Sequence, residues 1–295
     1  MILRTDLAIE AEGCGKNDFS GMKREEYASA GLKVTRIDIT DDRAARVIGK
    51  PMGRYVTVEG LEMTETFCDV REHIELIGQE LRRLLPSSEG TVLVVGLGNR
   101  DITPDALGPK CIEHIIATRH IKKELNKSAG LSSLKSVAAV APGVLGQTGI
   151  EAAEFLAGVV SRIRPVAMVA VDALASRSLA RLGTTIQLGD TGISPGGGIG
   201  SRRITLNEKT LGVPVIAAGV PTVVDAATLA WDILGKDGCE PDEERINEVM
   251  QGRSMFVTPK ETDLLTERGA RLLGMAINCA LQPEADFDTL VSLIS

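Results

Sequence analysis

The sequence has neither an excess of basic charge nor a long apolar run. Lysine and arginine number 33 against 40 aspartate and glutamate residues, which gives a formal net charge of -7. Nucleic-acid binding usually needs a basic surface, so this balance argues against direct binding to DNA or RNA. No apolar run reaches the roughly 18 residues that span a bilayer, and the first residues lack the apolar segment of a signal peptide. We therefore expect a cytoplasmic protein without a membrane span.

Metal and nucleophile motifs are also missing. The five cysteines are scattered and never form a Cys-x-x-Cys pair, which disfavours zinc and disulfide frameworks and is typical of reduced cytosolic thiols. No His-Glu-x-x-His motif is present, and the three histidines fall on predicted helices. None of them is well placed to serve as the base for a serine or cysteine nucleophile.

What the sequence does contain is the composition of a folded protein, with 43% hydrophobic and 25% charged residues. The first 30 residues or so are polar and predict a loosely held arm. From Thr91 onward, short apolar strands alternate with helices, which predicts an α/β fold with a mostly parallel sheet flanked by helices. We expect an α/β core over residues 90–235, an amino-terminal addition integrated with it, and a helical tail over 236–295. The predicted strands cover 34–39, 55–58, 92–95, 137–140, 166–171 and 213–217, and the predicted helices 68–85, 106–118, 149–164, 223–234 and 262–281.

A glycine turn follows the first strand of the predicted core and leads to Asp105. A dinucleotide-binding fingerprint would need a glycine where Asp101 stands, and an acid there would repel a pyrophosphate, so a nucleotide cofactor is disfavoured. Thr103 as N-cap and Pro104 at the first helical position predict that Asp105 lies in the first turn of a helix. Asp105 would then either complement the helix dipole or take part in catalysis.

A second aspartate, Asp172, directly follows the apolar residues 166–171. Sheets of this kind carry their chemistry at the carboxyl ends of the strands. Asp172 could cap the next turn, but together with Asp105 it forms a candidate catalytic pair, because two carboxylates can share a proton and act as acid and base on an amide. We expect no cofactor. The alternative is a divalent metal held by Asp105 and Asp172 with carbonyl groups or water.

The most glycine-rich stretch covers residues 192–203 and ends in two arginines. It lacks the Gly-Lys-Ser/Thr ending of a P-loop, which disfavours phosphate binding. It is either a flexible connection or a loop that lets an extended peptide backbone approach closely. In the second case Arg177, Arg202 or Arg203 would pair with an acidic side chain of the peptide.

Several long motifs occur along nearly the whole chain. They are Gly49-Lys50-Pro51 and residues 53–57, 95–99, 103–109, 171–178, 184–187, 190–196, 219–226 and 255–261. Together these motifs resemble the germination proteases of spore-forming Gram-positive bacteria. In that family the aspartates that match Asp105 and Asp172 are regarded as the catalytic pair. The family's sheet is related to that of the hydrogenase maturation endopeptidases, in which the matching positions bind metal.

The resemblance implies an endopeptidase that starts the degradation of small acid-soluble spore proteins during germination, in the forespore and spore core. It also implies a homotetrameric zymogen that removes its own pro-segment. The bond that matches the processing site is Asp6–Leu7, so residues 1–6 would be the pro-segment and 7–89 the amino-terminal addition. The alternatives are a metal-dependent peptidase that uses the same two aspartates and a noncatalytic α/β binding module.

Overall fold

One mixed sheet organises the protein. The computed structural model describes residues 5–11, 20–63, 70–124, 134–197, 203–236, 243–250 and 253–294. Within these residues nine strands form the sheet, in the order β1-β2-β3-β7-β8-β6-β4-β5, and β9 pairs with β8. The strands are β1 (Met22–Ser29), β2 (Leu32–Ile39), β3 (Gly53–Glu59), β4 (Val92–Gly96), β5 (Val137–Val140), β6 (Ala167–Ser176), β7 (Thr185–Gly189), β8 (Val215–Asp225) and β9 (Phe256–Val257).

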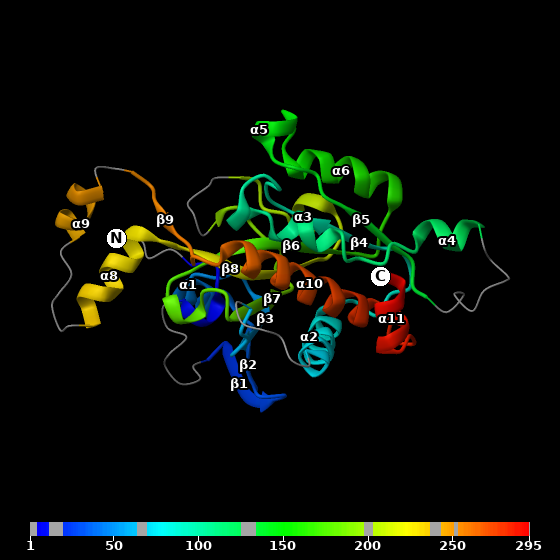
Figure 1. Ribbon diagram of the computed structural model, residues 1–295, viewed down its shortest axis with the longest axis horizontal. Coiled ribbons are helices and arrows are strands. Elements are labelled where there is room, and N and C mark those ends of the chain that lie inside the picture. Colours follow the sequence, from blue (N-terminus) through cyan, green and yellow to red (C-terminus); the bar gives the residue numbers. More distant parts are fainter. Residues whose placement is uncertain are drawn as a thin grey trace.

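Helices connect and cover the strands (Figure 1). None of those in the described residues is long and apolar enough to cross a membrane. The α-helices are α1 (Asp42–Ile48), α2 (Arg71–Leu84), α3 (Leu107–Ile112), α4 (Arg119–Glu124), α5 (Leu145–Thr148), α6 (Ala152–Ile163), α7 (Glu208–Leu211), α8 (Ala226–Lys236), α9 (Glu243–Met250), α10 (Thr262–Leu281) and α11 (Phe287–Ile294). The 3-10 turns are η1 (Ala8–Glu10), η2 (Thr103–Asp105) and η4 (Leu179–Arg181).

The α/β fold class is confirmed, but the parallel part of the sheet is smaller than predicted. β8, β6, β4 and β5 run parallel to one another, whereas β1, β2, β3, β7 and β9 add antiparallel pairs. Three antiparallel strands, β1, β7 and β9, were absent from the prediction. β1 has a charged sequence that alternates poorly, so that only its pairing with β2 identifies it as a strand.

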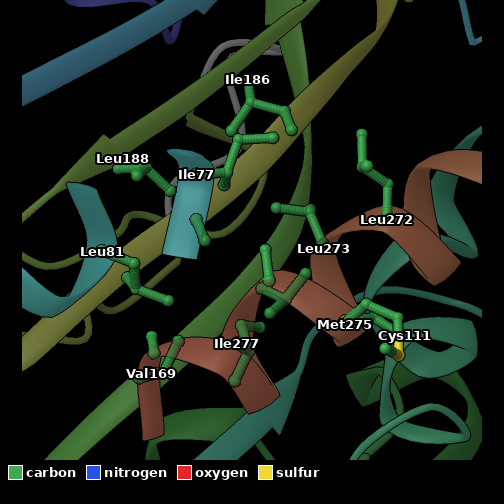
Figure 2. Close-up of a cluster of buried hydrophobic side chains, with 14 of the residues drawn as sticks. Ile77, Leu81, Cys111, Val169, Ile186, Leu188, Leu272, Leu273, Met275 and Ile277 are labelled. Carbon is green, nitrogen blue, oxygen red and sulfur yellow. The ribbon is translucent and has the colours of Figure 1, made fainter. Parts of the chain in front are cut away.

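The central strands are apolar on both faces because helices cover both sides. One face packs against α2, α3 and α10, and the other against α6. Figure 1 shows α6 and α10 on opposite sides of the sheet. Figure 2 shows the larger core, in which α2, α3 and α10 meet β6 and β7; its labelled side chains are Ile77, Leu81, Cys111, Val169, Ile186, Leu188, Leu272, Leu273, Met275 and Ile277.

Three sequence predictions need correction. The first 30 residues are not a loosely held arm where they are described, because residues 5–11 pack on the sheet and Met22–Ser29 pairs with β2. The helix predicted over 106–118 is short, since α3 ends at Ile112. The helix predicted from 223 begins at Ala226 instead, because Val223 and Val224 still pair with β6.

Two glycines let α3 approach the sheet at backbone distance. A Cβ atom on Gly96 of β4 would lie 2.2 Å from the carbonyl oxygen of Gly108 in α3, and a Cβ on Gly108 would lie 2.2 Å from that of Leu97. No side chain fits between these backbones. Because η2 directly precedes α3, this contact also fixes the position of Asp105.

We predict opposite effects for two glycine-to-alanine changes in helices. Gly108→Ala forces α3 away from β4, and should lower the free energy of unfolding by about 1–3 kcal/mol through overpacking. Gly158→Ala in α6 meets no atom within 4 Å, and should raise it by about 0.5–1 kcal/mol. Denaturant unfolding of both variants checks this, and equal effects would contradict the close contact.

Candidate active site

Asp172 is buried in the middle of the sheet. Strand β6 continues to Ser176, so Asp172 lies within the strand and not after it, opposite Gly219 of β8. Its side chain is on the face that carries Ala170 and Leu174, because side chains alternate along a strand. Only 4% of the residue is exposed. The backbone N–H of Ala173 donates to Asp172 Oδ1 at 2.9 Å.

Asp105 lies in the short 3-10 turn η2, whose N-cap is Ile102, so Thr103 does not cap it as predicted. Hydroxyl groups of two neighbouring elements hold this turn: Thr222 Oγ1 of β8 donates to the Pro104 carbonyl at 2.7 Å, and Thr266 Oγ1 of α10 donates to the Thr103 carbonyl at 3.1 Å. The half-buried Asp105 side chain is therefore presented from a fixed backbone.

The glycine turn after β4 also fixes the Asp105 carboxylate. The backbone N–H of Asn99 donates to Asp105 Oδ2 at 2.7 Å. Gly98 has a φ of +110°, and a Cβ there would lie 2.0 Å from the Asp105 carbonyl oxygen. Only glycine allows this turn, which aims the Asn99 amide at the carboxylate.

Burial and the Asp105 charge both affect the protonation of Asp172. Burial, followed by the charges of Asp105 and Asp6, raises the pKa of Asp172 well above its ordinary value, against the opposing effects of the Ala173 hydrogen bond and the Arg203 charge. Burial also raises the pKa of Asp105, which the Asn99 hydrogen bond and Arg203 partly oppose. The structure therefore brings the predicted pair together, and favours a state in which one carboxyl holds a proton.

The predicted processing bond lies on the same face of the sheet as Asp172. Asp6 pairs with Ala175 of β6: its N–H donates to the Ala175 carbonyl at 2.9 Å, and its Oδ2 accepts from the Ala175 N–H at 2.8 Å. Two residues further on, the Ala8 N–H donates to Gln187 Oε1 of β7 at 3.1 Å. Gln187 and Asp172 are both opposite Gly219. Residues 6–8 therefore run from Ala175 of β6 to Gln187 of β7, and Gln187 is in register with Gly219 and Asp172.

The two residues after this bond are more deeply buried than Thr5 and Asp6 before it. Leu7 and Ala8 are fully buried, and Leu7 packs with Leu174. The Glu10 side chain is 2% exposed. It accepts hydrogen bonds from Arg177 N at 2.6 Å, Ser178 N at 3.0 Å and Arg181 Nη1 at 3.2 Å.

The three arginines predicted to read an acidic side chain have different surroundings. Arg177 forms a two-pronged ion pair with Asp232 of α8, at 2.7 and 2.9 Å. Arg203 is exposed, and its charge lowers the pKa values of both Asp105 and Asp172. Arg202 lies outside the described residues. The Asp6 carboxylate accepts from the Ala175 backbone, a partner that sequence reasoning missed.

A cavity of about 150 Å³ adjoins the Asp6 side chain; Lys50, Tyr55, Leu174, Gln187 and Ile193 are among the residues that line it. The glycine-rich loop passes beside it, because a Cβ at Gly197 would lie 3.6 Å from Asp6 Oδ1. The cavity exceeds the roughly 30 Å³ that one water occupies in the liquid. Water therefore has room beside the processing bond.

Lys50, Glu10 and Gln187 were not singled out from the sequence, although all three hold the amino-terminal segment. Their contacts join residues up to 179 positions apart, which no local pattern reveals. Of the three, only Gln187 could have been noticed in the sequence, because it is an amide side chain within the apolar, fully buried strand β7. A buried polar side chain usually has a specific partner.

The described side chains include no cluster of three or more histidine, cysteine, aspartate or glutamate residues that could hold a metal ion. A metal at Asp105 and Asp172 would need carbonyl oxygens or water for its other ligands, which suits a hard cation such as Mg²⁺. Zinc prefers nitrogen and sulfur ligands and fits this donor set poorly.

We predict that Asp172→Asn makes the protein more stable above neutral pH. The raised pKa means that the folded state binds the proton more tightly than the unfolded state, so this stabilisation is present in acid and is lost as the pH rises through the raised pKa. Asparagine has no proton to lose. The Tm of the variant relative to wild type should therefore be several degrees higher at pH 8 than at pH 4, since about 1 kcal/mol shifts Tm by about 2–4 °C.

The control for this comparison is Asp288→Asn, because the Asp288 side chain is 86% exposed. Its Tm difference from wild type should not change with pH. If Asp172→Asn also shows the same Tm difference at both pH values, the buried carboxyl is not perturbed as described.

Comparison with known proteins places the chain in a family. Residues 4–236 match the family model of the germination proteases. Germination protease of Caldanaerobacter subterraneus subsp. tengcongensis is 44% identical, over 95% of this chain and 94% of that protein. Those of Clostridium tetani and Priestia megaterium are 40% and 34% identical, over 100% and 96% of this chain and 100% and 95% of theirs.

One solved structure, a [NiFe] hydrogenase maturation protease HycI from Thermococcus kodakarensis KOD1, covers 67% of this chain and 98% of its own, with 15% identity and a TM-score of 0.35. This likeness is too weak to add to the fold described above. The family model and the relatives, by contrast, cover most of the chain, and on their evidence this chain belongs to the germination protease family.

Proposed function

We propose that this protein is the endopeptidase that begins the degradation of small acid-soluble spore proteins, with Asp105 and Asp172 as its catalytic pair. Membership of the family gives it a protease role in spore germination. The observation that carries the finer proposal is the position of residues 5–8, which hydrogen-bond to Ala175 of β6 and to Gln187 of β7 on the face of the sheet that carries Asp172. A substrate chain would bind in the same way.

The pair would divide the work of hydrolysis between its two carboxyl groups. Asp172 is the more deeply buried, and its pKa is raised further, so it would hold the proton and act as the acid. Asp105, which is held by the Asn99 amide, would be ionised and take a proton from the attacking water. The two carboxyls titrate as a unit, so the pH dependence of activity belongs to the pair.

We also propose that the chain is a zymogen that cuts its own Asp6–Leu7 bond. In the uncut chain, the Asp6 carboxylate accepts the hydrogen bond of the Ala175 backbone N–H, which an acidic residue of a substrate would otherwise accept. The same arrangement suggests that the enzyme cuts after an acidic residue and before an apolar one, since Leu7 fills an apolar site. Arg203 remains a candidate for attracting the acidic side chain through its charge.

The setting of this activity is part of the proposal. The enzyme would work as a homotetramer in the forespore and spore core, without a cofactor and without binding DNA directly. The second candidate is a metal-dependent peptidase that uses the same two aspartates, which their convergence on one site supports. Activity that is lost with a chelator and restored by Mg²⁺ would favour it.

We predict that Asp105→Asn and Asp172→Asn each remove cleavage without unfolding the protein, because each changes a charge but little volume. The loss should be about 10²- to 10⁴-fold for each group. The measurement is incubation of each variant, made as a chain beginning at Leu7, with a small acid-soluble spore protein, followed by mass spectrometry of the fragments. The control is the exposed Asp288→Asn. Fragments that end mainly in neutral or basic residues, or turnover by either variant at the wild-type rate, would contradict the proposal.

We predict that a chain beginning at Leu7 is active at once, whereas the full-length chain shows a lag that shortens as processing proceeds. Mild acid should speed processing, because one carboxyl of the pair, or Asp6 itself, is then more often protonated and the crowded negative charges repel one another less. Asp6→Lys should block processing. Amino-terminal sequencing over time at two pH values measures this. Full activity of the intact chain, with an unchanged terminus, would rule out the zymogen.

A further inference from the structure

Lys50 contacts the carbonyl group of the proposed processing bond. Its Nζ donates to the carbonyl oxygen of Asp6 at 3.0 Å and to that of Thr5 at 3.2 Å. The Asp6 carbonyl is the one that water would attack if the Asp6–Leu7 bond is cut. A charged donor already 3.0 Å from the Asp6 carbonyl oxygen of the uncut chain is placed to stabilise the oxyanion that forms from that oxygen.

The fold holds Lys50 in this place. Gly49, with a φ of +73°, ends α1 in the left-handed conformation, which turns the chain back toward the sheet. Pro51 follows, and its carbonyl accepts a hydrogen bond from Tyr55 Oη of β3 at 2.8 Å. Lys50 is thus half-buried in a short turn between two fixed elements, which limits where its side chain can reach.

The proposed processing bond has the Lys50 ammonium as a direct neighbour and lies on the sheet face that carries Asp172. Asp172 is on the same sheet face as the segment, and Asp6 is close enough for its charge to affect Asp172. Lys50 lies in the turn before β3, and β3 is separated from β8 by β7. Lys50 therefore reaches Thr5 and Asp6 from the β3 side of the sheet. Asp6 and Lys50 line the same 150 Å³ cavity, which has room for water.

We propose that Lys50 is a further catalytic residue of this protease, which stabilises the negative charge on the carbonyl oxygen of the bond being cut. The inference rests on the proposed function. It extends from the processing bond to substrates, whose carbonyl groups would take the places of those of Thr5 and Asp6. Arg177 and Arg203 do not offer the same contact in the described structure, since Arg177 pairs with Asp232 and Arg203 is exposed.

In the proposed hydrolysis of the Asp6–Leu7 bond, water attacks the Asp6 carbonyl carbon and gives one proton to the ionised Asp105. The electron pair of the C=O bond moves to the oxygen, which becomes an oxyanion next to the Lys50 ammonium. When the oxyanion collapses, the C–N bond breaks, and the Leu7 nitrogen takes the proton of Asp172. The products are a carboxylic acid at Asp6 and an amine at Leu7, and the pair retains one proton.

The test compares three full-length variants with wild type. Lys50→Met removes the charge at similar length, Lys50→Arg keeps a charged donor, and Lys33→Met is the matched control, because Lys33 is a half-exposed lysine of β2 that pairs with Glu26. The rate of cleavage at Asp6–Leu7 is followed by mass spectrometry. Each variant is then left to process to completion, and its kcat and KM are measured on a peptide of residues 1–12.

We expect Lys50→Met to slow self-processing and to lower kcat on the peptide by about 10²- to 10³-fold. Both rates should be at least tenfold higher for Lys50→Arg than for Lys50→Met. Lys33→Met should process itself and cleave the peptide at the wild-type rates. Hydrogen exchange at the Asp6 amide separates catalysis from docking. If Lys50 acts on the oxyanion, the amide of the Lys50→Met variant stays protected while cleavage is slow.

Two results would overturn the inference. One is processing of Lys50→Met within threefold of the wild-type rate. The other is slow processing together with a lost Asp6 amide protection and a normal kcat on the peptide, which would make Lys50 a docking residue only. In both cases wild type still cuts Asp6–Leu7, so the proposed function stands. If wild type never cuts this bond, both the self-processing proposal and the inference are wrong.

Discussion

The burial of one carboxyl group, Asp172, is the constraint around which the site is arranged. Strand β6 is buried along its whole length except at Ala173, and an ionised carboxylate in such surroundings is strongly disfavoured. Holding a proton is the simplest way to relieve this cost. In the proposed mechanism Asp172 would then need a partner that accepts a proton, and Asp105 would be that partner. The charge of Arg203 opposes the rise in the pKa of Asp172.

The position of Asp105 depends on backbone packing more than on its own side chain. The contact of Gly96 with Gly108 sets the distance between α3 and β4, and Gly98 turns the chain between them. Hydrogen bonds from Thr222 and Thr266 then fix the carbonyls of η2. The glycines at these three positions therefore determine where Asp105 lies, because any side chain there would move Asp105 relative to Asp172.

Much of the core could be predicted from the sequence, because it is local. The apolar strands at 92–95 and 137–140 and the helix at 262–281 are found where periodicity places them. The sequence did not reveal β1, because its charged side chains have water around them and its partner is another strand. The end of β6 was also missed, since Asp172 resembles a strand terminator until β8 is seen to pair with it.

The candidate site divides in the same way. Asp105 and Asp172 could be found because each follows an apolar strand directly or through a glycine turn. The groups that contact residues 5–8 could not be found in this way. Lys50, Gln187 and Ala175 lie far apart in the sequence, and only the fold brings them to this segment. The motif Gly49-Lys50-Pro51 is a turn by its sequence alone. Its lysine acquires chemical meaning from the carbonyl that it contacts.

The two sides of the Asp6–Leu7 bond are held by interactions of different kinds. On the amino side, Thr5 and Asp6 are held by hydrogen bonds that involve the charged groups of Lys50, Asp6 and Glu10, each worth about 1.5–3 kcal/mol. On the carboxyl side, full burial of Leu7 contributes about 1.5–3 kcal/mol, and the buried Glu10 carboxylate accepts from Arg177, Ser178 and Arg181.

While the chain is intact, the buried residues Leu7 to Glu10 keep Thr5 and Asp6 beside their hydrogen-bond partners. The effective concentration of Thr5 and Asp6 at those partners is therefore high. If the bond is cut as proposed, Thr5 and Asp6 are no longer joined to Leu7, whereas Leu7 to Glu10 would remain on the sheet as one wall of the site. The backbone of Ala175 and the ammonium of Lys50 would then face the next acidic peptide, so that the contacts which hold Thr5 and Asp6 before cleavage would become the contacts that bind substrate afterwards.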